Sequence, residues 1–207
     1  LTTGTQNTFL GSLAGDATTT TSDNVAIGYF ALSAASGGTN VAVGSQCLDA
    51  NTTGLNNTAV GRQALDNNTT GSQNVAVGTN TLDANTTADS NTAVGTSALR
   101  NNTTGTLNTA VGKDALNANI TGSNNVSIGY IALEANTTGG KNVAIGGGAL
   151  NRNTTASDNT AVGDSALADN TTGTANSSLG KRALKSNTTA NNNVAVGYHS
   201  LEENTTG

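Results

Sequence analysis

Residues 51–67 read NTTGLNNTAVGRQALDN, and residues 68–84 read NTTGSQNVAVGTNTLDA. The two stretches share an Asn-Thr-Thr-Gly start, a central Asn, a Thr/Val-Ala-Val-Gly segment, and a Leu four residues after that Gly. Self-similarity at a fixed short period is the sequence signature of a repeat architecture. This unit therefore decides the fold, and the rest of the chain is interpreted from it.

The same unit fills the whole chain. We number its positions 1 to 17 from the first Asn, so that the recurring Gly is position 11. The spacing between these glycines is 17 residues, except for 16 between Gly28 and Gly44. The twelve glycines are Gly11, Gly28, Gly44, Gly61, Gly78, Gly95, Gly112, Gly129, Gly146, Gly163, Gly180 and Gly197. We predict a single continuous array over residues 1–207, and we expect it to be a segment of a longer chain.

Each unit is better suited to strands and turns than to helix. Gly, Asn and Thr are poor helix formers, and the apolar positions keep no helical period. Thr/Val-Ala-Val is short, β-branched and bounded by Asn and Gly, which is typical of a strand. Asn-Thr-Thr-Gly favours a turn, and Ala-Leu favours a second short strand or a bend. The sequence therefore predicts an all-β parallel β-solenoid with one 17-residue repeat per coil and about twelve coils.

Stacked coils would lie about 4.7–4.9 Å apart, giving a rod of roughly 55–60 Å. The position 10 column is always Val, Ile or Leu, and the position 9 column is almost always Ala. Neighbouring strand residues point to opposite faces, so both faces of the strand are expected to be covered. We expect one face to form the core, with one Val and one Leu buried per coil, and a second chain to cover the other.

The composition excludes several classes of function. Only 10% of residues are charged, the formal net charge is −5, and no Lys/Arg cluster suggests nucleic acid or an anionic membrane as partner. No apolar run is long enough to span a membrane. Met, Trp and Pro are absent and only 2% of residues are aromatic, so the core must be thin. A thin core favours self-association.

The Asn-Val-Ala-Ile-Gly segments at Asn24–Gly28 and Asn142–Gly146 resemble the head repeats of trimeric autotransporter adhesins. The Asn-Thr-Ala-Val-Gly-x-x-Ala-Leu units resemble repeats of phage and bacterial tail-fibre-like proteins. The resemblance covers every unit, although an Asn-Thr-Thr-Gly corner makes the unit longer than that of the adhesin heads. It implies a left-handed β-roll and a trimer; a helical filament of many chains is the alternative.

Asn-x-Thr recurs at position 1, where each Asn is an N-glycosylation acceptor by sequence. If modified, these residues would carry covalent N-glycans along one edge of the rod; no other cofactor is expected. The alternative is an unmodified turn ladder in which Asn and Thr hydrogen-bond between coils. The acceptors are Asn51, Asn68, Asn85, Asn102, Asn119, Asn136, Asn153, Asn170, Asn187 and Asn204.

A second Asn column, at position 7, is constant in all twelve units. We expect it to be a structural ladder, inward or at a corner, that satisfies backbone groups of the turn. Its members are Asn7, Asn24, Asn40, Asn57, Asn74, Asn91, Asn108, Asn125, Asn142, Asn159, Asn176 and Asn193.

Other chemistry is weakly indicated. His199 is the only histidine, so no catalytic Ser/His/Asp or Cys/His set is expected, and no enzyme. Cys47 replaces a small core Ala and is expected to serve packing. The run Asp49, Asp66 and Asp83 is too short to predict a metal site. An ice-binding array of Asn and Thr is a further alternative, which the following Gly argues against.

The expected function is structural: a repeat rod of an extracellular filament, fibre or adhesin at a cell or virion surface, self-assembling through small-residue faces. The rival hypothesis is a receptor-binding adhesin or tail-fibre module that recognises a host-surface or glycan receptor. In that case the variable pair at positions 12 and 13 would carry the specificity.

Overall fold

The structure is a computed structural model that describes residues 3–34 and 37–206. The chain divides into two compact units, Leu1–Thr104 and Gly105–Gly207. The described residues contain strands and turns and no helix. The all-β prediction is therefore confirmed.

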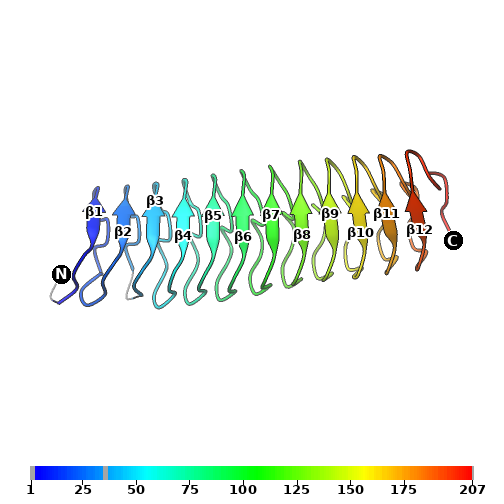
Figure 1. Cartoon of the computed structure of the whole chain (residues 1–207). Coiled ribbons are helices and arrows are strands. Elements are labelled where there is room, and N and C mark those ends of the chain that lie inside the picture. Colours follow the sequence, from blue (N-terminus) through cyan, green and yellow to red (C-terminus); the bar gives the residue numbers. More distant parts are fainter. Residues whose placement is uncertain (1–2, 35–36, 207) are drawn as a thin grey trace. The chain divides into compact units, whose positions relative to one another are not determined.

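Each unit contributes six three-residue strands, which follow one another side by side in chain order (Figure 1). In the first unit they are β1 (Thr8–Leu10), β2 (Val25–Ile27), β3 (Val41–Val43), β4 (Thr58–Val60), β5 (Val75–Val77) and β6 (Thr92–Val94). In the second they are β7 (Thr109–Val111), β8 (Val126–Ile128), β9 (Val143–Ile145), β10 (Thr160–Val162), β11 (Ser177–Leu179) and β12 (Val194–Val196).

Consecutive strands within a unit pair in parallel, with like positions opposite each other. Ala59 of β4 lies opposite Ala76 of β5, and Ala144 of β9 lies opposite Ala161 of β10. Ala26 and Ala42 keep this register although their coil has one residue fewer. One repeat therefore makes one coil of a parallel β-solenoid, as predicted. The Ala-Leu segment forms turns and not a second strand. Left-handedness stays a prediction.

The core of each unit is built from alanine and leucine. The Ala of position 9 and the Ala-Leu pair of positions 14 and 15 are fully buried in most coils, for example Ala59, Ala64 and Leu65. The expectation that the position 10 Val would fill the core is wrong. In a three-residue strand the central side chain points one way and its two neighbours point the other. Here the central Ala points inward because the coil is too narrow for two larger columns.

The coil closes through residues whose backbone is in the left-handed region. The buried Leu of position 15 has a φ of 55° at Leu65 and 52° at Leu82, and positions 6 and 13 are similar. This conformation costs a non-glycine residue about 1–2 kcal/mol. The Leu65 N–H donates to the Thr81 carbonyl of the next coil at 3.0 Å, and burying a leucine contributes about 1.5–3 kcal/mol. Stacking therefore offsets the strain.

Position 11 requires glycine for two reasons. Gly61 has a φ of +132°, and a Cβ built on it would lie 2.5 Å from the Gly78 carbonyl oxygen of the next coil. Side-chain-bearing residues avoid this conformation, and no Cβ fits between backbones stacked this closely. The constancy of the glycine column thus follows from coil stacking.

The first coil departs from the consensus at two positions that compensate each other. Phe9 stands in the Ala column, and Gly15 stands in the Leu column. A Cβ on Gly15 would lie 2.6 Å from the Phe9 ring. The phenyl ring thus fills the volume that leucine occupies in the other coils.

Candidate functional site

The position 7 asparagines form a buried ladder on the inside of each unit. The Asn125 backbone N–H donates to the Asn108 side-chain oxygen at 3.0 Å, and the Asn142 N–H donates to the Asn125 oxygen at 3.0 Å. The Asn125 Nδ2 donates to the Gly139 carbonyl at 2.9 Å. Each amide thus completes backbone groups that the turn before the strand leaves unpaired.

The position 1 asparagines form a second buried ladder beside the first. The Asn136 Nδ2 donates to the Asn119 side-chain oxygen at 2.9 Å and to the Gly139 carbonyl at 2.9 Å. The Gly139 carbonyl therefore accepts a hydrogen bond from each ladder, from Asn125 and from Asn136. The same double acceptance recurs at Gly54, Gly71, Ala88, Ala156, Gly173 and Ala190.

This geometry bears on the N-glycan and turn-ladder interpretations. The side chains of Asn51, Asn68, Asn85, Asn102, Asn119, Asn136, Asn153, Asn170 and Asn187 are fully buried, and Asn204 is half-buried. Nδ2, the atom that would carry a glycan, is hydrogen-bonded inside the coil in each position 1 bond described above. A sugar on Asn136 would replace one of the two Nδ2 hydrogens, so at least one of the two donated bonds would be lost, and the fully buried side chain leaves the sugar no exit to solvent. The structure therefore favours the turn-ladder alternative.

The Asn–Thr array considered for ice binding is also not displayed. Thr53 is exposed, but its partner Asn51 points into the core. The sequence spacing gave no sign of this, because Asn-x-Thr on an extended segment places both side chains on one side. The actual segment turns at this point, which separates them.

The outer face of each sheet consists of the two columns at positions 8 and 10. These columns hold Val, Ile, Leu and Thr, with one Ser, and no charged residue in any unit. Ile128 and Ile145 are 38% and 36% exposed even though paired strands flank both of them on either side. This apolar face, the outer sheet face, is available for contact with another molecule. The small-residue Ala face that we expected to assemble chains is instead the core.

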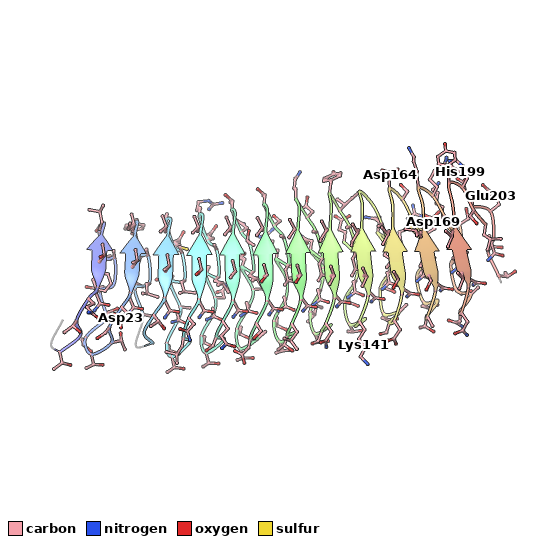
Figure 2. The ribbon with its side chains drawn as sticks, in the orientation of Figure 1. Asp23, Lys141, Asp164, Asp169, His199 and Glu203 are labelled. Atoms are coloured by element: carbon pink, nitrogen blue, oxygen red, sulfur yellow. The ribbon has the colours of Figure 1, made fainter. Side chains whose placement is uncertain are left out.

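Charged and aromatic side chains lie at the two edges of the coil. In the second unit Lys141 projects beyond the N-terminal ends of the strands, and Asp164 beyond their C-terminal ends (Figure 2). All three tyrosines of the chain occupy position 12, and Tyr29, Tyr130 and Tyr198 are 53%, 58% and 73% exposed. Position 12 is thus a largely exposed column whose residue type varies from repeat to repeat.

Three stacked aspartates form the acidic cluster of the first unit. Burial, followed by the charges of Asp83 and Asp49, raises the pKa of the Asp66 carboxyl above its ordinary value. Asp83 also pairs with Arg100 at 3.5 Å. Within the described residues, no group of three or more His, Cys, Asp or Glu side chains is placed to hold a metal ion.

The remaining reactive side chains have packing or surface contacts. Cys47 is fully buried in the position 14 column, and burial raises the pKa of its thiol to about 12. Its Sγ contacts the Ala59 carbonyl oxygen at 3.1 Å. His199 pairs through Nδ1 with Glu202 at the corner of the last coil. Cys47 therefore belongs to the packed core, and His199 belongs to an ion pair at the corner of the coil.

A shallow polar groove with a volume of about 350 Å³ runs along one corner of the second unit. It follows positions 3, 5 and 6 of three successive coils. Thr121, Thr138, Lys141 and Asp158 are among the residues that line it. Gly140 has no side chain to fill it.

No protein-family model, curated protein or solved structure matches the chain. Across residues 3–34 and 37–206, no helix has the length and apolarity that a membrane crossing requires. The likeness to adhesin heads and tail fibres therefore stays an expectation from the repeat motif.

Proposed function

We propose that this chain is a structural, non-enzymatic repeat element of an extracellular filament, fibre or adhesin, and that copies of it associate through the outer sheet face. The observation that supports this is the continuous uncharged stripe at positions 8 and 10. Charged residues occur at positions 5, 6, 12, 13, 16 and 17, so their complete absence from these two columns is selective.

The size of the face sets what it can bind. Six coils at about 4.8 Å and three residues at about 3.3 Å give each unit a face of roughly 29 by 10 Å. A patch of about 290 Å² is no larger than the largest apolar patch of an ordinary monomer, and it is well below the ~800 Å² that a partner buries in a standard interface. A partner must therefore match many coils in register.

A second copy of the chain meets that requirement. It has the same spacing between coils, so a contact made at one coil is repeated at all the remaining coils. Two such faces would pack about 10 Å apart, as stacked sheets do. Trimers and helical filaments are both compatible with this contact.

Lysine on the outer sheet face tests the proposal. We expect the wild-type protein to sediment as an oligomer, and the double variant Val60→Lys/Val77→Lys to sediment at a lower mass with an unchanged circular dichroism spectrum. The control is Ser45→Lys/Thr79→Lys at position 12, where Lys113 and Lys181 occur naturally. A monomeric wild-type protein, or equal loss of mass in the control, would contradict the proposal.

A second candidate function is receptor binding, as in an adhesin head or tail-fibre module. The observation that favours it is the exposure of Tyr29, Tyr130 and Tyr198 at the same corner position. Exposed aromatic side chains are enriched in binding surfaces. Replacing all three by Ser should abolish binding to a cell or glycan array without changing the oligomer mass.

A further inference from the structure

Position 3 is an exposed column that stays chemically constant. In the first compact unit it holds Thr53, Thr70, Thr87 and Thr104, and in the second compact unit it holds every seventeenth residue from Thr121 to Thr206. All of these threonines are exposed. We call this column the threonine file.

The constancy is not a remnant of repeat duplication. Positions next to the file have diverged: position 5 holds the exposed Leu55, the half-buried Ser72 and the exposed Asp89 in three successive repeats. Position 12 holds Arg62 and Thr79 in the first two of those repeats. A column that remains constant among such neighbours is maintained for its side chain.

The N-glycosylation motif does not explain the file either. In the first three repeats position 1 is Leu1, Thr18 and Ala34, so these repeats contain no Asn-x-Thr motif at that position. Position 3 of the same units still carries a hydroxyl, at Thr3, Thr20 and Ser36. Ser36 lies outside the described residues.

Coil stacking supplies no structural reason for the hydroxyl. The Thr69 hydroxyl at position 2 donates to the Thr86 carbonyl at 2.9 Å, and the Thr154 hydroxyl donates to the Thr171 carbonyl at 3.2 Å. Position 3 hydroxyls make no such bond among the described residues. Position 2 nevertheless tolerates Ile120, whereas position 3 tolerates no apolar residue.

We propose that the threonine file is an array of O-glycosylation acceptors. In the transfer step Thr Oγ1 attacks the anomeric carbon of a sugar activated by a nucleotide or lipid diphosphate. The new C–O bond replaces the bond to phosphate, the diphosphate leaves with the electron pair, and the hydroxyl proton passes to a base of the transferase.

The surroundings suit a neutral sugar. Positions 1 to 4 contain no charged residue in any unit, so one transferase would meet nearly the same acceptor throughout. Thr121 and Thr138 line the polar groove of about 350 Å³, so there is open space beside these two residues. Phosphate is unsuited, because dianions one coil apart lie well within the Debye length of about 8 Å and would repel.

The test is peptide mass mapping, with electron-transfer fragmentation, of the protein isolated from the organism that makes it. We expect sugar mass increments on position 3 threonines and none on position 1 asparagines. In that host Thr70→Val should lose one increment, and Thr70→Ser should keep it. The control Thr69→Val should keep every increment but lower the unfolding midpoint, because it removes a hydrogen bond between coils.

Unmodified peptides, or sugar on the position 1 asparagines, would overturn the proposal. So would a loss of unfolding midpoint in Thr70→Val as large as in Thr69→Val, since that result would give the hydroxyl a structural role. None of these outcomes depends on the oligomeric state, so the proposed assembly function is tested separately.

Discussion

Replacing Asn125 by Asp changes one buried NH2 group into an oxygen and hardly alters the side-chain shape. Asn125 is fully buried, and its Nδ2 donates to the Gly139 carbonyl at 2.9 Å and to the Asn108 side-chain oxygen at 3.2 Å. An ionised carboxyl at this position places acceptor against acceptor in both contacts. The matched control is Asn124→Asp, because Asn124 is the exposed neighbour in the same coil.

The two lost hydrogen bonds cost about 1–3 kcal/mol, at about 0.5–1.5 kcal/mol each. Burying a carboxylate whose one remaining donor is the Asn142 backbone N–H costs several kcal/mol more, unless the group takes up a proton. We expect Asn125→Asp to lower the free energy of unfolding by about 4 kcal/mol at pH 7. The loss should shrink to about 2 kcal/mol at acid pH, where the protonated group donates one bond.

The sign of the pH dependence follows from linkage. The new carboxyl has a folded-state pKa above its unfolded value, so the variant is most stable below the unfolded pKa and loses stability as pH rises through the folded pKa. Urea denaturation followed by far-ultraviolet circular dichroism at pH 3.5 and 7 measures this. Equal destabilisation of the Asn124 and Asn125 variants, or no recovery at acid pH, would refute the inward ladder.

Three further predictions concern single positions. Burial raises the pKa of the Cys47 thiol to about 12, so about one thiol in ten thousand is ionised at pH 8. Iodoacetamide should therefore label Cys47 only after urea has unfolded the protein. Equal labelling rates with and without urea would contradict the burial of Cys47. Gly61→Ala should lower the free energy of unfolding by about 3 kcal/mol or more. The control Gly197→Ala has a similar positive φ, but its Cβ would meet only Ser200 at 3.9 Å, so it should lose about 1–2 kcal/mol. Equal losses of the two variants in urea titrations would contradict the argument from coil stacking. The raised pKa of Asp66 makes the protein less stable as pH rises above the ordinary carboxyl range. Asp66→Asn should therefore raise the urea midpoint at pH 7 and flatten the dependence of that midpoint on pH. An unchanged plot of urea midpoint against pH would show that Asp66 is solvated.

The repeat period and the strand were predictable because they depend on spacing and local propensity. Val75–Val77 is β-branched and lies between Asn74 and Gly78, so its conformation follows from the residues themselves. The constant glycine column was also visible in the sequence, and the structure gives its reason, since no Cβ fits between the stacked backbones.

The direction in which each strand faces was not predictable. In Val75–Val77 both columns are apolar or small, so the pattern does not say which side points inward. The left-handed conformation of the position 15 leucines was equally hidden, because leucine has no preference for it and stacked coils impose it. Asn-x-Thr suggested an exposed acceptor, whereas its constancy alongside the position 7 column was the available signal of a buried ladder.

X-ray diffraction from oriented protein tests the central claim most directly. Stacked coils joined by backbone hydrogen bonds predict a strong reflection at about 4.7–4.9 Å along the stacking direction, together with a β-type circular dichroism spectrum. A helical spectrum, or an oriented sample without that reflection, would contradict one 17-residue coil per repeat.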